Sequence, residues 1–205
     1  MLSFRDSLPN LRSNIRFLHA AAGAPAVDIY ANGNLLDSNV SFSNSTKYSE
    51  VPPGKCKIEF FKAGTYDTPI SKEIIDLKPN ITMTISAILD ESNLVTFKLI
   101  DGLDKTNAPL TNLRFITLSP SAPLLTLALP SGTTLFNGVE YLETTNYYSL
   151  SAGIYDFLLT ATNDSSFRKF LKDIDLQSDY FHTIYIIGLV DQKPQLGYLY
   201  LKDGL

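Results

Sequence analysis

The chain contains two copies of one residue pattern, and this repeat limits its fold more than any other feature. Residues 14–17 (Asn-Ile-Arg-Phe) return 98 positions later as residues 112–115 (Asn-Leu-Arg-Phe). Later landmarks keep a similar spacing, including Tyr48 with Tyr147, and each half ends in Asp-Gly-Leu. A period of this length is too long for a solenoid repeat and matches the size of a whole domain. The sequence therefore predicts two related domains in tandem.

The repeat also sets the expected domain boundaries. Residues 14–103 and 112–205 are the two predicted domains, preceded by a polar N-terminal arm over residues 1–13 and joined by a polar linker over residues 104–111. So short a linker indicates that the domains lie close together. A domain of this size buries only roughly 60–65% of its unfolded surface, so contact between the two would add to their stability.

Short alternating runs between turn residues indicate β-strands in both repeats. The pair Asn32-Gly33 lies between two extended runs and is a strong hairpin signal, because both residues tolerate positive φ. Further strands are expected over residues 55–62, 81–89, 94–100, 113–117, 124–129, 147–150, 154–160, 182–190 and 196–201. Ser165–Leu171 is the best candidate for a helix. The predicted fold is all-β, with two tandem antiparallel β-sandwich domains of the immunoglobulin-like or transthyretin-like kind.

Composition argues against several classes of function. The 17 basic residues are scattered in a chain of net charge −4, so no basic face for nucleic acid is expected. No apolar stretch approaches the length of a membrane span, so membrane insertion is not expected either. Charged residues make up only 19% of the chain, and a neutral, hydroxyl-rich surface favours self-association. The single cysteine, Cys56, excludes an intramolecular disulfide and is expected to be a small buried residue, with intermolecular crosslinking as the alternative.

The order of the motifs resembles the domain-of-unknown-function 4397 family. The run from Arg16 to Tyr30 is similar to the family pattern R-F-x-H-x-S-P-x-A-P-x-V-D-V-Y, and residues 48–54 and 61–64 resemble its later motifs. Repeat two keeps Arg114 and a Ser-Pro-Ser-Ala-Pro run that ends at Pro123. The resemblance covers nearly the whole chain from residue 14. It implies tandem modules with no general enzymatic activity, often at the surface of bacteria and archaea.

Six residues of these motifs are expected to have structural roles: Arg16, His19, Pro25, Asp28, Arg114 and Pro123. His19 would pack at the edge of the core and hydrogen-bond the turn that follows it. Asp28 would accept hydrogen bonds in a turn or across strands. A metal site shared by the two is the alternative, but zinc needs three or four such ligands and no His or Cys cluster supplies them. Repeat two has Thr117 and Thr126 at these positions. No cofactor or metal ion is expected.

Four tyrosines are the candidate interaction residues: Tyr147, Tyr148, Tyr198 and Tyr200. Strand alternation places Tyr198 and Tyr200 on one face. Either these rings pair across strands inside the sheet, or they form an exposed strip that binds a sugar or another subunit. No G-x-S-x-G elbow or glycine-rich phosphate loop points to catalysis.

The sequence therefore predicts a non-enzymatic structural or surface protein that assembles through sandwich faces and edges. Its expected partners are further copies of itself or other surface and coat proteins. The expected location is a bacterial spore surface or cell envelope, since the first residues do not form a secretory signal and a coat protein made in the cytoplasm needs none. A glycan- or protein-binding module that uses loops or the tyrosine strip is the alternative. A hydrolase with converging carboxylates is the third reading.

Overall fold

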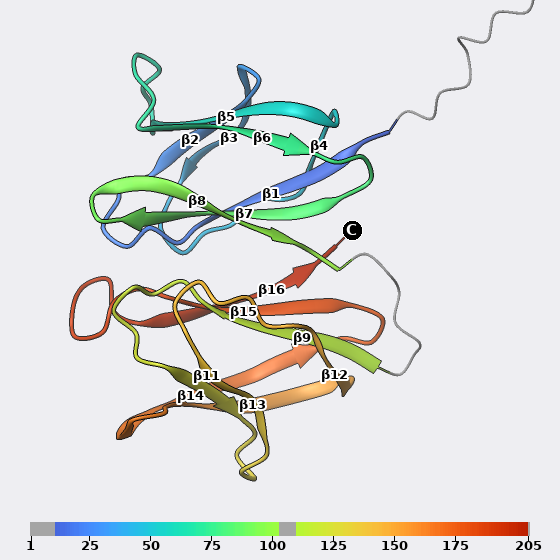
Figure 1. Ribbon diagram of the computed structural model, residues 1–205, viewed down its shortest axis with the longest axis vertical. Helices are drawn as coiled ribbons and strands as arrows, with labels where there is room; N and C mark the ends of the chain where they lie inside the picture. Colours follow the sequence, from blue (N-terminus) through green and yellow to red (C-terminus); the bar gives the residue numbers. More distant parts are fainter. Residues whose placement is uncertain (1–10, 103–109, 205) are drawn as a thin grey trace, which may run out of the picture. The chain divides into compact units, whose positions relative to one another are not determined.

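The computed structural model describes residues 11–102 and 110–204, which fold as β-strands and turns without a helix (Figure 1). The expected arm (1–13) and linker (104–111) lie almost entirely outside these residues. Unit 1 contains residues 11–19 and 24–100, and unit 2 contains residues 20–23, 101–102 and 110–204. The predicted all-β class, with two sandwiches, is confirmed.

Unit 1 is a sandwich of two four-stranded sheets. Its strands are β1 (Ser13–His19), β2 (Val27–Ala31), β3 (Asn34–Val40), β4 (Ser49–Val51), β5 (Gly54–Lys62), β6 (Ser71–Leu77), β7 (Thr82–Asp90) and β8 (Asn93–Ile100). One sheet has the order β4-β1-β7-β8 and the other the order β3-β2-β5-β6. Between the sheets, Phe17 of β1 packs edge-on against Phe60 of β5, with ring centroids 5.8 Å apart. Such interdigitation of two inner faces forms the core of a sandwich.

Unit 2 repeats this architecture strand for strand. Its strands are β9 (Leu110–Thr117), β10 (Leu125–Ala128), β11 (Thr134–Val139), β12 (Tyr148–Ser151), β13 (Gly153–Ala161), β14 (Asp164–Leu176), β15 (Phe181–Ile187) and β16 (Gly197–Asp203). The sheets have the orders β12-β9-β15-β16 and β11-β10-β13-β14. In both units the first strand runs parallel to the seventh, and the other pairs are antiparallel. The repeat in the sequence is therefore also a repeat of topology.

The strand order differs from that of an immunoglobulin domain. There the first, second, fourth and fifth strands share a sheet. Here the second and fifth strands pair, but the first lies in the other sheet beside the fourth. Of the two sandwich kinds expected, the immunoglobulin order is therefore not followed.

Two local predictions had opposite outcomes. The hairpin at Asn32-Gly33 is confirmed: it joins β2 to β3, with φ of 50° and 81°. The helix over Ser165–Leu171 is wrong, because these residues belong to β14 and pair with β13. Leu171 faces the core while its neighbour Phe170 faces outward, which is the alternation of a strand.

One further feature agrees with the expectations from composition. Cys56 lies fully buried on the inner face of β5, and burial raises the pKa of its thiol. In residues 11–102 and 110–204 there is no helix with the length and hydropathy to cross a membrane.

Candidate functional site

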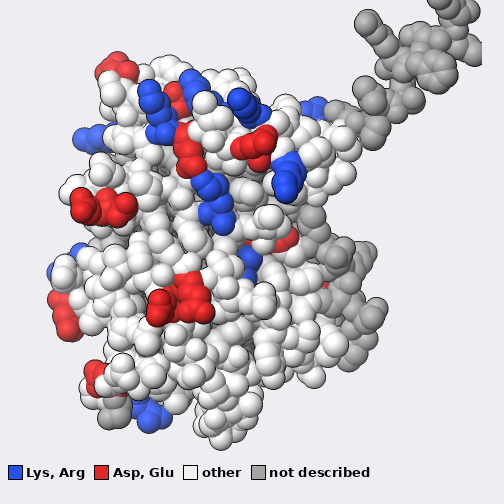
Figure 2. All heavy atoms as spheres, viewed as in Figure 1, with Lys and Arg blue, Asp and Glu red and all other residues white. Residues whose placement is uncertain are grey.

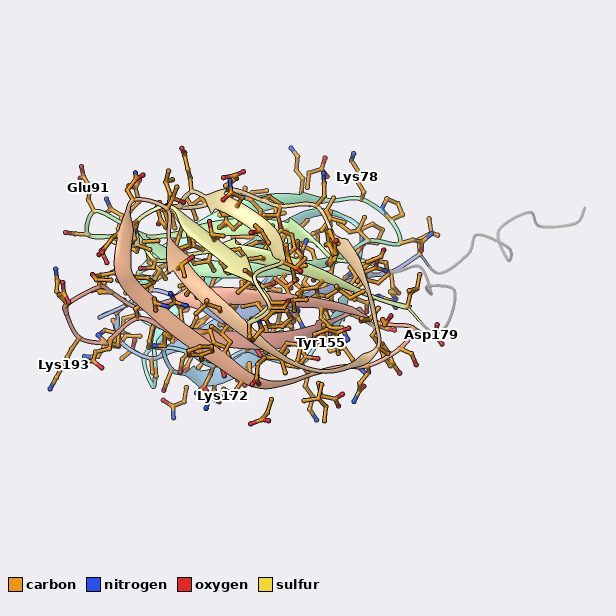
Figure 3. The ribbon with its side chains drawn as sticks, turned by 90° about the horizontal axis from the view of Figure 1, so that it is seen from below. Lys78, Glu91, Tyr155, Lys172, Asp179 and Lys193 are labelled. Carbon is orange, nitrogen blue, oxygen red and sulfur yellow. The ribbon has the colours of Figure 1, made fainter. Side chains whose placement is uncertain are left out.

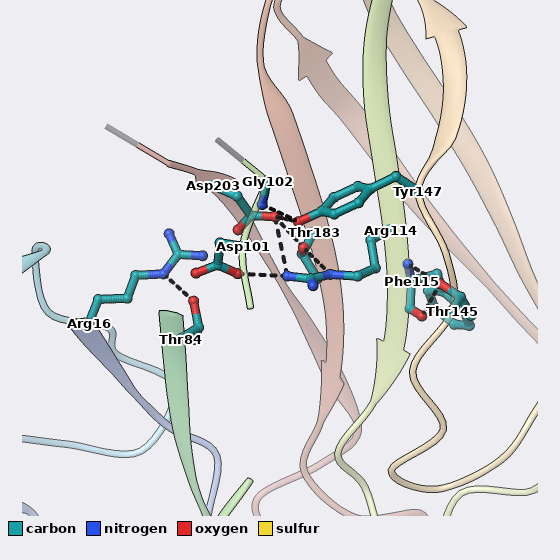
Figure 4. A network of polar contacts seen from close by, with 10 residues as sticks. All are labelled: Arg16, Thr84, Asp101, Gly102, Arg114, Phe115, Thr145, Tyr147, Thr183 and Asp203. Atoms are coloured by element: carbon teal, nitrogen blue, oxygen red, sulfur yellow. Dashed lines mark hydrogen bonds and ion pairs between the residues drawn. The ribbon is translucent and has the colours of Figure 1, made fainter. Parts of the chain in front are cut away.

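The densest group of buried charges lies in unit 2, around Arg114 of β9. The Arg114 Nη2 lies 2.7 Å from Oδ1 of Asp101, which follows the end of β8, and 3.5 Å from Oδ2 of Asp203 at the end of β16. Its Nε donates to the Thr183 hydroxyl on β15 at 3.0 Å (Figure 4). The side chain of Arg114 is only 3% exposed. One guanidinium is thus held between two carboxylates, away from water.

Tyr147 completes this Arg114 cluster. Its ring centroid lies 4.6 Å from the guanidinium carbon of Arg114, which is a cation–π distance. Its hydroxyl donates to Asp203 Oδ2 at 2.8 Å and accepts from the backbone N–H of Gly102 at 3.2 Å. The Thr183 hydroxyl also donates to Asp203. These polar groups therefore satisfy one another, as burial requires.

The electrostatics of the cluster oppose acid–base chemistry. Burial alone would lower the pKa of Arg114, but Tyr185, Asp203, Tyr147 and Asp101 outweigh that effect and raise it. Burial, together with the charge of Asp203, raises the pKa of Tyr147. A general acid or base needs a pKa near the working pH. The cluster is therefore suited to holding strands together rather than to moving protons.

Unit 1 contains the matching set around Arg16. Arg16 Nε donates to the Thr84 hydroxyl of β7 at 2.8 Å (Figure 4), and the guanidinium lies 4.7 Å from the centroid of the Tyr48 ring. Arg16 and Arg114 were identified from the sequence, but the threonine and aspartate partners were missed. The sequence did offer a signal for the aspartates, since Asp101 and Asp203 each begin the Asp-Gly-Leu that ends a repeat, but it did not show that they meet at Arg114.

His19 and Asp28 both bind backbone groups in turns of unit 1. His19 Nε2 is hydrogen-bonded to the carbonyl of Pro25 at 2.9 Å. Asp28 accepts from the backbone N–H groups of Asn39 and Gly64, at 2.7 and 2.8 Å. Across the described residues, no group of three or more His, Cys, Asp and Glu is placed to hold a metal ion.

Pro25 and Pro123 occupy equivalent places in the two units. Each is exposed in the segment before the second strand, β2 in unit 1 and β10 in unit 2. This position suits a residue with fixed φ that turns the chain into an extended run. Neither proline contributes a group that could do chemistry.

The four candidate tyrosines do not form one exposed strip. Tyr198 and Tyr200 are half-buried and pack against the core of unit 2. The Tyr200 hydroxyl donates to the carbonyl of Asp175 and is hydrogen-bonded to His182 Nδ1 at 2.7 Å. Tyr147 belongs to the Arg114 cluster, which leaves only Tyr148 exposed, at 43%. Packing inside the sandwich, the simpler of the two expectations, describes this set better.

The two histidines predict a pH dependence of stability. Burial lowers the pKa of His19 and of His182 below the usual 6.5. Below pH 6.5 the unfolded chain therefore binds protons that the folded chain does not, so the free energy of unfolding falls as the pH drops toward the folded pKa. Urea unfolding should show a plateau above about pH 7 and a decline below it. His182→Gln should reduce the decline, and an unchanged slope would contradict this assignment.

The main exposed apolar surface of unit 1 is an apolar patch on the outer face of its β3-β2-β5-β6 sheet. The rings of Tyr30, Phe61 and Tyr66 lie within 4.6 to 5.3 Å of one another, and Tyr66 is 57% exposed. Leu35 pairs with Tyr30 across strands. The backbone N–H of Ile70 donates to the Phe60 carbonyl at 2.8 Å, which places Ile70 beside Phe61. The patch therefore consists of Tyr30, Leu35, Phe61, Tyr66 and Ile70, with Ile74 further along β6.

Unit 2 has an apolar row on the equivalent sheet. The half-buried Leu158 and the exposed Phe170 are paired across β13 and β14, next to the buried Ala128 of β10, and Ile154 lies further along β13 with 72% of its surface exposed. Exposed apolar groups of this kind commonly mark contact surfaces. On the face drawn in Figure 2, charges of both signs are interspersed among uncharged side chains.

Comparison with protein-family models gives a match. The family model described as "Domain of unknown function (DUF4397)" matches residues 13–128, which is more than half of the chain. The match spans all eight strands of unit 1 and continues through β10 of unit 2. No curated protein shows a significant match.

Proposed function

Because the chain belongs to the DUF4397 family, whose description names no activity, we propose from its surfaces that it is a non-enzymatic structural protein that self-assembles. The observation that supports this role is the apolar patch of unit 1. Isolated exposed apolar residues are normal, but Leu35 and Ile74 lie on the outer face of one sheet, and Tyr66 and Ile70 of the loop between β5 and β6 lie beside that face. Contact with another protein would remove this surface from water.

The occupant we propose is the outer face of unit 2 in a second copy. That face offers the apolar row through Phe170, and two sheets pack face to face when both present apolar side chains. Its exposed acids are Asp156, Asp173 and Asp175, whereas the exposed lysines beside the patch are Lys55, Lys57 and Lys72. Lys55 lies opposite the exposed Asp76 and Lys57 is ion-paired with Glu59, so the two apolar surfaces, rather than a difference in charge, favour this pairing.

Polar substitution in the patch should weaken the assembly. Burial of one isoleucine contributes roughly 1.5–3 kcal/mol, and about 1.4 kcal/mol corresponds to a tenfold change in affinity. The double variant Ile70→Ser/Ile74→Ser should therefore raise the concentration needed for association at least about tenfold. Sedimentation velocity over a range of concentrations measures this, with circular dichroism to verify folding.

Ile100→Ser is the matched control. Ile100 is also an exposed isoleucine, but it ends β8 in the other sheet of unit 1, so its substitution should leave association unchanged. A wild-type protein that remains monomeric at high concentration would rule out the proposed role, and equal effects of both variants would exclude the patch.

A spore coat or cell envelope is the setting we propose for this assembly, with other surface or coat proteins as further partners. Glycan binding is the second candidate function. A groove in unit 2 favours it.

A further inference from the structure

Unit 2 departs from unit 1 at two places. The first is the connection between the last two strands: β7 and β8 are joined by Glu91-Ser92, whereas β15 and β16 are joined by a loop over residues 188–196. The second is β14, which has 13 residues where β6 has 7. The additional residues of β14 include Phe167 and Arg168. Because the two units otherwise share their topology, these additions are specific to unit 2.

The two additions together line an open groove of about 330 Å³. Its lining residues come from the start of β14 and from the loop: Phe167, Arg168, Lys169, Leu189, Val190, Asp191, Gln195 and Leu196. Figure 3 shows Lys193 of the same loop projecting outward from unit 2. The volume falls at the lower end of the roughly 300–1,000 Å³ typical of small-ligand sites.

The loop is fixed by hydrogen bonds rather than loosely attached. The backbone N–H of Leu189 donates to the Pro194 carbonyl at 2.9 Å, and that of Leu196 donates to the Leu189 carbonyl at 2.8 Å. The N–H of Val190 donates to the Ser121 hydroxyl at 2.8 Å. The Lys169 ammonium donates to the Leu196 carbonyl, which ties β14 to the loop. A binding site held in place before the ligand arrives loses less entropy on binding.

Gly188 permits this closed form of the loop. Its φ is +87°, and a Cβ at this position would lie 2.4 Å from the backbone oxygen of Gln195. A side chain there would force the loop away from its position, because a backbone atom cannot yield as a flexible side chain does.

The lining chemistry indicates the class of ligand. Phe167, Val190 and Leu196 supply apolar surface, while Arg168, Asp191 and Gln195 supply a guanidinium, a carboxylate and an amide. Arg168 and Asp191 carry opposite charges, and the ammonium of Lys169 is bound to the Leu196 carbonyl, so the lining does not gather the several free cations that would select an anion such as phosphate. A sugar has apolar C–H faces and many hydroxyls that donate and accept, and it matches both parts of this lining. We propose that the groove of unit 2 binds a neutral carbohydrate.

Titration with four sugars, followed by amide chemical shifts, tests the proposal on the whole chain. The probes are glucose, cellotriose, N-acetylglucosamine and chitotriose at millimolar concentration. At least one should shift the amides of Phe167, Lys169, Val190 and Gln195. Asp191→Ala and Gln195→Ala should each weaken that binding about tenfold or more, since each leaves polar groups of the bound sugar unpaired.

Three matched results decide the outcome. Glu91→Ala, in the short turn of unit 1, should leave sugar binding unchanged, whereas Gly188→Ala should abolish it while the shifts of unit 1 stay in place. The assembly variant Ile70→Ser/Ile74→Ser should bind as the wild type does, which separates this proposal from self-association. No shift with any of the four sugars, or shifts outside the groove, would overturn it.

Discussion

Replacement of Arg114 by methionine is expected to lower the free energy of unfolding by roughly 3–5 kcal/mol, the usual cost of removing one partner from a buried ion pair. The physical reason is the pair of carboxylates that remains. Asp101 and Asp203 are both buried, and the guanidinium lies within 2.7 and 3.5 Å of them. Methionine fills a similar volume, so most of the loss reflects charge rather than packing. Urea unfolding followed by circular dichroism measures it.

Arg168→Met is the control, because Arg168 is an exposed arginine of the same unit. Surface changes of this kind usually stay within about 0.5 kcal/mol. Adding Asp101→Asn and Asp203→Asn to Arg114→Met should recover part of the stability, since the amides remove the uncompensated charge. If Arg114→Met costs no more than Arg168→Met, the cluster is solvated and its proposed role in holding β9, β15 and β16 together fails.

The sequence predicted Arg114 of this cluster, and Arg16 of the matching set in unit 1, but not the carboxylate partners of Arg114. Arg16 and Arg114 hold equivalent places in the two repeats, so comparison of the repeats was enough to find them. Asp101 lies 13 residues before Arg114 and Asp203 lies 89 residues after it, so their meeting depends on which strands end side by side. Strand order is a property of the folded chain, and no local pattern encodes it.

The prediction of a helix over Ser165–Leu171 failed for a related reason. In a short segment without helix caps, pairing with a neighbouring strand can override the intrinsic preference for a helix. Here Leu158 and Leu159 of β13 pair with Phe170 and Lys169. Cross-strand contacts outweigh intrinsic propensity in so short a run. The equivalent segment of unit 1 did not indicate a strand either, because residues 63–70 form a loop there.

The tyrosines show that strand alternation predicts which residues share a face but not which face is buried. It placed Tyr198 and Tyr200 on one face of β16, but Leu199 and Leu201 are also apolar, so the pattern could not tell which face lies inward. The exposed aromatic surface instead involves Tyr66, which follows β5 in a loop and packs beside Tyr30 with its ring tilted by 47°. Loop residues do not alternate between two faces as strand residues do, so the contacts of Tyr66 could not be predicted from the sequence pattern.

Two phenylalanines on opposite faces of one sheet in unit 2 should differ in how much stability is lost when each is replaced by alanine. Phe157 of β13 is fully buried and stacks on Tyr155 with ring centroids 5.7 Å apart, whereas Phe170 of β14 is 49% exposed. Phe157→Ala removes buried apolar atoms and leaves a cavity, so it should cost roughly 3–5 kcal/mol. Phe170→Ala makes the same chemical change without a cavity and should cost about 1 kcal/mol or less. Urea unfolding of both variants measures the difference. Equal losses would mean that the outer face of β13 and β14 is as tightly packed as the core, so it would not be available to a second copy.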